Sequence, residues 1–168
     1  MKIKFLLPLA CVVLFTACNN SSDKKEKKED NAMNMDTMHN MPDPGVNIPE
    51  LPAIPEGAKV FFKNLKNGAT ISSLYKLEMG TEVIKVDTAG PVVAGSGHHH
   101  LFIDAEDSFA ASTIVPKDSA HIHFGKGQTE YELKLSPGKH KLTLQMADGL
   151  HRSYGGRLAA TIMVNVKK

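Results

Sequence analysis

The sequence predicts an all-β domain over residues 55–168, an immunoglobulin-like antiparallel β-sandwich of seven or eight strands that follows a disordered tether. Two observations carry this prediction. Apolar residues alternate with period two, and Gly, Pro and Asn-Gly turns separate the alternating runs. Short strands spaced in this way over roughly 110 residues are typical of a sandwich, and no long helical pattern interrupts them. A small closed barrel is the structural alternative.

Each expected strand presents one apolar face. In the run 129–135, Tyr131, Leu133 and Leu135 share a face and charged residues alternate with them. Because side chains alternate along a strand, that face is expected to point into the core. The expected runs are 60–62, 74–79, 82–86, 98–105, 121–124, 129–135, 140–146 and 160–166.

The composition excludes several function classes. The 168 residues carry a formal charge of +2, which is too small for a strongly basic nucleic-acid binder. Aromatic residues make up 6% and Trp is absent, so an aromatic stacking platform for single strands or sugars is not expected. The eight His and eight Met are the unusual features of this composition.

Residues 1–17 resemble a bacterial lipoprotein signal peptide. Lys2 and Lys4 precede a short apolar run, and Thr16-Ala17 stands before Cys18. The pattern predicts cleavage before Cys18, lipid (palmitate included) on its sulfur, and anchoring in the cell envelope. Asn19 after the cysteine gives no signal for inner-membrane retention, so the outer membrane is favoured. The alternative is an ordinary secretory signal with an incidental Cys.

The predicted cleavage removes Lys2, Lys4 and Cys11, which leaves 18 basic and 18 acidic residues. With lipid on Cys18, no thiol remains for a disulfide or for a metal ligand. A blue-copper centre is therefore excluded, because such a site requires a thiolate.

Residues 18–54 have the composition of a tether, first charged and then rich in Met and Pro. Such a segment cannot bury enough apolar surface to offset its ordering entropy. It also predicts a Cu(I)-binding segment, because thioethers select that ion. The alternative is incidental linker composition. The proposed tether ligands are Met33, Met35, Met38, His39 and Met41.

Two His-x-His pairs predict a metal site in the domain. Strand alternation places His98 and His100 on one face, and His121 and His123 on the side away from Ile122. Alternate residues of a strand lie ~6.6 Å apart and neighbouring strands ~4.8 Å, so four imidazoles can share one Cu(II) or Zn(II) ion. Asp104 and His151 are candidates to complete the ligand set.

Each histidine also has a simpler interpretation. The four paired residues can form a solvated or hydrogen-bonded polar patch, and His151 follows a turn where a surface histidine is the default. His99 and His140 align with apolar neighbours and are expected to be core residues rather than ligands.

These patterns favour a binding protein that performs no turnover. The sequence contains no His-Glu-x-x-His, no Gly-x-Ser-x-Gly and no phosphate-binding Gly loop. The expected function is transition-metal sequestration or hand-off in the envelope, with copper favoured and zinc as the alternative ion. A non-catalytic adhesion or assembly module with an envelope protein partner is the first alternative. A metalloenzyme similar to copper–zinc superoxide dismutase is the second.

Several short motifs lie along the domain: Pro55-Glu56-Gly57-Ala58, Gly97-His98-His99-His100-Leu101, Ile103-Asp104, His121-Ile122-His123-Phe124-Gly125, Gly127-Gln128-Thr129, Leu135-Ser136-Pro137-Gly138, His140, Ala147-Asp148-Gly149 and His151. Together they resemble family 4399 of the domains of unknown function, a family of bacterial extracytoplasmic proteins. The resemblance covers residues 55–168 and leaves the Met-rich tether outside. It implies a secreted or lipid-anchored β-rich domain and brings no established activity.

Overall fold

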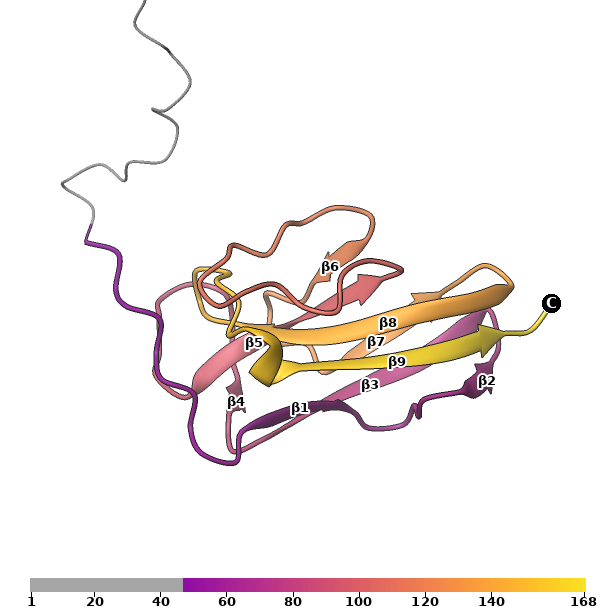
Figure 1. Cartoon of the computed structure of the whole chain (residues 1–168), viewed down its shortest axis with the longest axis horizontal. Coiled ribbons are helices and arrows are strands. Elements are labelled where there is room, and N and C mark those ends of the chain that lie inside the picture. The colour runs from indigo at the N-terminus through magenta and orange to yellow at the C-terminus, as the bar shows by residue number, and fades with distance from the viewer. Residues whose placement is uncertain (1–46) are drawn as a thin grey trace, which may run out of the picture. The chain divides into compact units, whose positions relative to one another are not determined.

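The computed structural model describes residues 47–168. The predictions for the signal peptide, for Cys18 and for the tether ligands at residues 33–41 lie outside the described residues. Figure 1 shows the strands, which are β1 (Lys59–Phe62), β2 (Ala69–Ile71), β3 (Leu74–Glu82), β4 (Lys85–Val86), β5 (Ser96–Ile103), β6 (His121–His123), β7 (Glu130–Lys134), β8 (Gly138–Ala147) and β9 (Ala159–Val166).

The strands form two sheets, which confirms the predicted all-β sandwich. One sheet has the order β1-β3-β7, and the other has the order β2-β9-β8-β5-β4 with β6 also paired to β5. Most neighbours are antiparallel, whereas the short strands β2 and β4 pair in parallel with β9 and β5. The one helical element in the described residues is a 3-10 turn, Gly156–Leu158. β2 has only three residues, too few for an alternating pattern to predict it.

Strand β5 has neighbours on both of its edges. β8 runs antiparallel along one edge and pairs with residues 98–103. The other edge is divided, because β4 pairs with Ser96 and Gly97 while β6 pairs with residues 100–102. The strand that carries three consecutive histidines therefore lies inside the larger sheet.

The main core lies between the two sheets. The three-stranded sheet contributes Leu77, Met79 and Leu133, all at most 1% exposed. The larger sheet contributes apolar residues of β5, β8 and β9 to the same cluster, namely Leu101, Leu142, Leu144, Met146, Val164 and Val166. The predicted inward faces of residues 74–79, 129–135 and 140–146 are thus confirmed.

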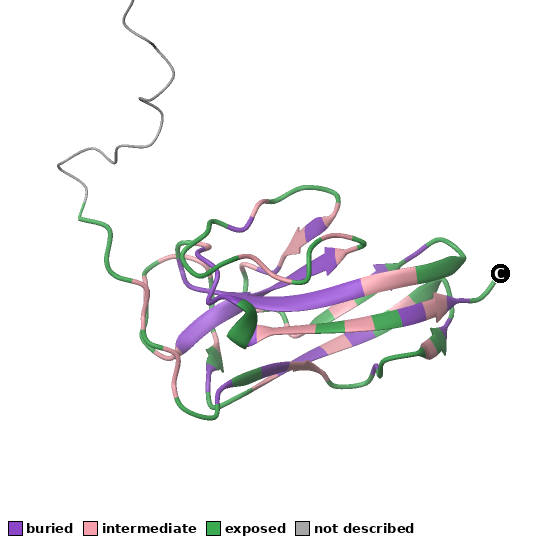
Figure 2. Ribbon diagram, in the orientation of Figure 1, coloured by how far each residue is buried: buried purple, intermediate pink, exposed green. Residues whose placement is uncertain are grey.

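The opposite face of the larger sheet is also covered. Phe102 of β5 and Ala147 of β8 form a second small core with Val115, against which Phe109 packs. Val115 belongs to the connection between β5 and β6, and its amide donates to the His151 carbonyl in the connection after β8. These two connections cover the face of β5 that points away from the main core. β5 is therefore buried on both faces, which Figure 2 shows as a strand that is purple over most of its length.

The chain packs on the domain before its first strand. Leu51 and Ile54, placed in the tether by the sequence prediction, contact the main core. The Arg152 guanidinium donates to the Pro49 carbonyl at 2.6 Å, which fixes this segment beside the turn after β8. Among residues 47–168, the structure contains no helix of the length and apolarity needed to cross a membrane.

Candidate metal centre

Three histidine side chains converge on the covered face of the larger sheet. His98 and His100 project from the same side of β5, and His123 of β6 lies directly opposite His100 in the strand register. One ligand atom from each of the three residues can be chosen so that all lie within 4.8 Å of one another. The predicted convergence of His-x-His side chains on one point is therefore present for these three residues.

The spacing of the three rings suits one small cation. The Nε2 atoms of His98 and His100 are 3.0 Å apart. Nitrogens bound ~2.0–2.1 Å from one ion stand roughly 3.4 Å from each other, so small ring rotations bring this pair to coordination distance. The His123 ring is centred 5.0 Å from that of His98 and 5.1 Å from that of His100.

Burial keeps the two β5 imidazoles uncharged. His98 is 0% and His100 is 1% exposed. Desolvation, with the positive charge of neighbouring histidines as a second cause, lowers the pKa of His98 to about 4 and that of His100 to about 2. Both rings are therefore neutral at pH 7, the form in which imidazole binds a metal.

His123 is held against the other two rings by the turn that follows it. Desolvation lowers its pKa, and His151 and Lys117 add to the effect. A Cβ atom at Gly125 would overlap the Cε1 and Nε2 atoms of the His123 ring. Only glycine fits at position 125 with this ring orientation, because any larger residue must displace the imidazole.

His151 lies beside the group of three. Its ring is centred 4.6 Å from that of His123 and 5.1 Å from that of His98. Its backbone is in the left-handed region with a φ of 66°, and the Asp148 carboxylate holds this turn by accepting from the amides of Leu150 and Arg152. The residue is close enough to act as an additional donor after a ring rotation.

The connection before β5 joins the two turns that carry His123 and His151. The Ala89 amide donates to the Gly125 carbonyl at 2.9 Å, and the Gly90 amide donates to the Gly149 carbonyl at 2.9 Å. A Cβ atom at Gly149 would overlap the carbonyl oxygens of residues 90 and 91. The cluster is thus built on β5 and clamped by backbone contacts between three connections.

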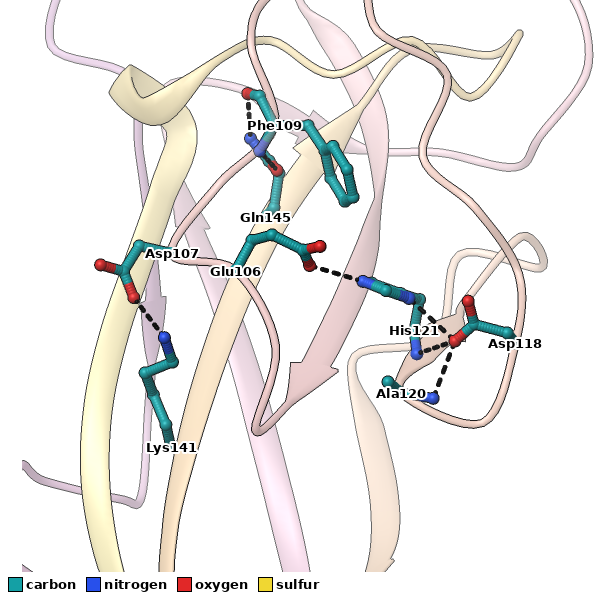
Figure 3. A network of polar contacts seen from close by, with 8 residues as sticks. All are labelled: Glu106, Asp107, Phe109, Asp118, Ala120, His121, Lys141 and Gln145. Carbon is teal, nitrogen blue, oxygen red and sulfur yellow. Dashed lines mark hydrogen bonds and ion pairs between the residues drawn. The ribbon is translucent and has the colours of Figure 1, made fainter.

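His121 is not part of this cluster, contrary to the predicted four-histidine site. It lies opposite Phe102 in the register, two pairs further along β5 than the His100–His123 pair. Its Nδ1 is 2.8 Å from Asp118 Oδ1 and its Nε2 is 2.9 Å from Glu106 Oε2, as Figure 3 shows. Desolvation lowers the pKa of His121, but the two carboxylates outweigh it and raise the pKa above its ordinary value. Both ring nitrogens are occupied by carboxylates, which removes His121 from the ligand set.

Asp104 also lies away from the cluster. It follows β5 with a φ of 55°, and its Oδ2 accepts from His140 Nδ1 at 2.7 Å. His140 Nε2 donates to the Ser136 carbonyl at 2.9 Å, while the Ser136 hydroxyl is 3.4 Å away. Burial lowers the pKa of His140, and these partners reverse the effect and raise it. A protonated ring that donates from both nitrogens is a poor base, so this Asp-His-Ser group acts as a clasp.

His99 is buried in the main core, as the sequence predicts, and is 0% exposed. Neither of its ring nitrogens has a hydrogen-bond partner in the described part of the chain. Desolvation, followed by the charge of Lys63, lowers its pKa to about 4. His140 shares this face of the sheet but is hydrogen-bonded at the edge, not in the core.

Two supporting features were not predicted. Gly125 follows the His-Ile-His-Phe run directly, and a Gly two residues after a candidate ligand is a signal for close approach. Asp148 and Arg152 form a buried ion pair, with Arg152 Nε 2.8 Å from Asp148 Oδ2. The sequence predicts a turn before His151, but residue spacing alone does not show that the carboxylate of Asp148 in this turn is buried.

The fold and the side-chain geometry define an all-β domain with a buried histidine cluster. The family model described as "Domain of unknown function (DUF4399)" matches residues 77–167, more than half of the chain. The protein therefore belongs to this family, and β5, β6 and the turn with His151 all lie inside the matched region. No curated protein matches the chain, and no solved structure matches it.

Proposed function

We propose that the domain binds one transition-metal ion through the imidazoles of His98, His100 and His123, with His151 as an additional donor. Convergence of three neutral imidazoles in a buried place is the observation that carries the proposal. The expected ion is copper, with zinc as the alternative, because imidazole suits both ions and the Met-rich segment of the same chain has the thioethers that select Cu(I).

Unpaired ring nitrogens in the cluster support the proposal that a cation binds there. Nδ1 of His98, Nδ1 of His100, Nε2 of His123 and Nδ1 of His151 are buried without a partner among residues 47–168. Each buried unsatisfied group costs about 1–3 kcal/mol of folding free energy. An ion bound through the crowded Nε2 atoms of His98 and His100 would leave their Nδ1 atoms unpaired, and would return only the part of that cost that belongs to His123 and His151.

The proposed role is sequestration or hand-off. The donors lie under two connections, and the proposed ion would be reached from the side of the half-buried His123 and His151 rings. Such an arrangement protects an ion from solvent and leaves little room for a substrate beside it. We propose the same envelope location as the sequence predicts, with anchoring through lipid on Cys18, and the Met-rich segment of residues 33–41 as a separate Cu(I) ligand.

Metal analysis of the full chain, expressed in its natural host and desalted, tests the proposal. We expect the wild type to retain metal, and His123→Ala to lose the one equivalent that the domain holds while it keeps any metal bound by residues 33–41. His121→Ala is the matched control, because it removes a histidine from the same strand whose nitrogens already have partners. A wild-type protein without metal, or equal metal in both variants, would favour the adhesion or assembly module instead.

A further inference from the structure

We infer that the centre formed by His98, His100 and His123 selects Cu(I) over divalent ions such as Zn(II) and Cu(II). The inference rests on the proposed function, because it names the charge state of the ion in the same site. Four features of the described residues lead to it, namely the charge around the site, the environment of the outer ring nitrogens, burial, and the number of donors.

The surroundings supply no free negative charge to balance a divalent ion. The group of convergent ligands in the described chain consists of histidines alone. Asp148 is the nearby acid that acts on His98, but Arg152 binds its Oδ2 from Nε at 2.8 Å and from Nη2 at 2.6 Å. Lys117 adds positive charge beside His123. The ion would therefore keep its full charge inside the domain.

The ring nitrogens that face away from the site do not strengthen the histidines as ligands for a divalent ion either. Histidines that bind zinc usually donate their second N–H to a carboxylate or a backbone carbonyl, which strengthens them as ligands. With the Nε2 atoms of His98 and His100 turned toward each other, the Nδ1 atoms face outward. Neither Nδ1 has a partner in the part of the chain that the structure describes. Two of the three neutral imidazoles therefore lack this support, which makes them weak donors for a hard divalent ion.

Burial amplifies the effect of charge. His98 and His100 are almost completely removed from solvent. The free energy of moving an ion from water into a medium of low dielectric constant grows with the square of its charge, so a divalent ion costs about four times as much as a monovalent one. Because Arg152 already pairs with the nearby Asp148, this difference favours the ion with the lower charge.

The number of donors points the same way. Cu(I), a filled-shell ion of low charge, is stable with three nitrogen ligands. Structural Zn(II) sites almost always have four ligands. His151 is close, but its nitrogens are not within the 4.8 Å group that the other three rings form. The group as it stands offers three donors, and a fourth ligand for zinc would require the His151 ring to rotate toward it.

The test uses the full chain with the tether ligands removed by M33L, M35L, M38L, M41L and H39A, so that ions can bind only in the domain. Three probes are compared at pH 7: Ag(I) as a monovalent ion that needs no reductant, Cu(I) under anaerobic competition with a chromophoric chelator, and Zn(II). We expect one equivalent of Ag(I) or Cu(I), bound about 100-fold or more tightly than Zn(II). In the same background, H123A should weaken Cu(I) binding and H121A should not.

Three results would count against the inference in different ways. Zn(II) affinity equal to or above that for Cu(I) would overturn the charge selection and leave the metal site intact. No binding of any of these ions to a folded protein would overturn the proposed function as well. Retention of Cu(I) by H123A would place the ion outside the cluster and also refute the inference.

Discussion

His121 and His123 lie two residues apart on the same strand and project from the same face of the sheet, yet their environments are opposite. His121 has a carboxylate on each ring nitrogen, from Glu106 and Asp118. His123 faces the rings of His98, His100 and His151. The pKa of His121 is raised and that of His123 is lowered.

The difference shows that neighbours, and not the His-x-His spacing, determine what each ring can bind. Acids on both sides let His121 hold a proton and act as a fixed cation that ties the connection between β5 and β6 to the sheet. The aromatic neighbours of His123 are the imidazoles of His98, His100 and His151, and its lowered pKa keeps the ring neutral. The first ring is already satisfied, whereas the second belongs to a group that suits a metal ion.

Metal-linked stability separates the two residues most sharply. An ion at 100 times its dissociation constant should raise the free energy of unfolding by about 2.7 kcal/mol, because it binds only the folded state. The wild type and His121→Ala should both show this gain, and His123→Ala should not. Urea denaturation with and without Ag(I) measures it. A gain in His123→Ala would place the ion elsewhere.

Acid should destabilise the domain through its neutral buried histidines. The pKa values of His98 and His99 fall to about 4 and that of His100 to about 2, against 6.5 in the unfolded chain. Below pH 6.5 the unfolded state therefore binds more protons, and stability falls by up to about 1.4 kcal/mol per pH unit for each histidine. The pKa values of His121 and His140 are raised in the folded state, so the stabilisation that these two residues contribute is fully present below pH 6.5. They therefore do not alter this slope.

Urea denaturation of the metal-free protein at pH 6.5 and pH 5.0 measures this loss. His99→Leu should make the loss smaller, because it removes one of the three groups and leaves the proposed ligands unchanged. The same variant should keep its metal. His99→Ala opens a cavity in the core, so it should lose more stability, but it should also keep its metal. Equal stability at the two pH values would contradict the neutral state of the cluster.

Gly125→Ala should weaken metal binding about tenfold or more, equivalent to roughly 1.4 kcal/mol, because its Cβ overlaps the His123 ring. The backbone of Gly125 is not in the left-handed region, so the alanine itself introduces no backbone strain. Ion titration followed by circular dichroism separates lost affinity from lost folding. Unchanged affinity would show that the ring can turn away and still coordinate.

The smallest effect is expected at the clasp of Asp104 and His140. Asp104→Asn should cost about 0.2–1 kcal/mol, as is usual for pairs near the surface. Burial opposes ionisation of Asp104, but hydrogen bonds from Lys141 and His140 together lower its pKa. Between about pH 3.8 and pH 6.5, Asp104 is therefore ionised and His140 is protonated, and the ion pair contributes its full stabilisation. This stabilisation falls as the pH rises through the raised pKa of His140. Thermal unfolding at pH 6 and pH 9 should show the larger loss at pH 6, with no loss of metal.

The period-two pattern was sufficient to assign the faces of β5. It placed His98 and His100 together and His99 on the core side, because alternation is a property of the strand itself. It could not show that the other face is covered, since the covering segments have no regular pattern. Those connections, and not the strand, bury the two histidines.

Which histidine of β6 would join the cluster could not be predicted either. The answer depends on the register between β5 and β6, which pairs His100 with His123 and Phe102 with His121. A shift of two residues would bring His121 to His100 instead, with the same sequence pattern. Asp104 was proposed as a ligand, but it lies four residues beyond His100, ~13 Å along an extended strand.

Histidine ring nitrogens, observed by nitrogen NMR during titration of the full chain with Ag(I), test the central claim most directly. The account predicts that the ring signals of His98, His100 and His123 change together and saturate at one equivalent in the domain. The signals of His121 and His140 should stay in place, because carboxylates and a carbonyl already hold those nitrogens. Simultaneous shifts at His121, or no shift at His123, would contradict a centre built from these three rings.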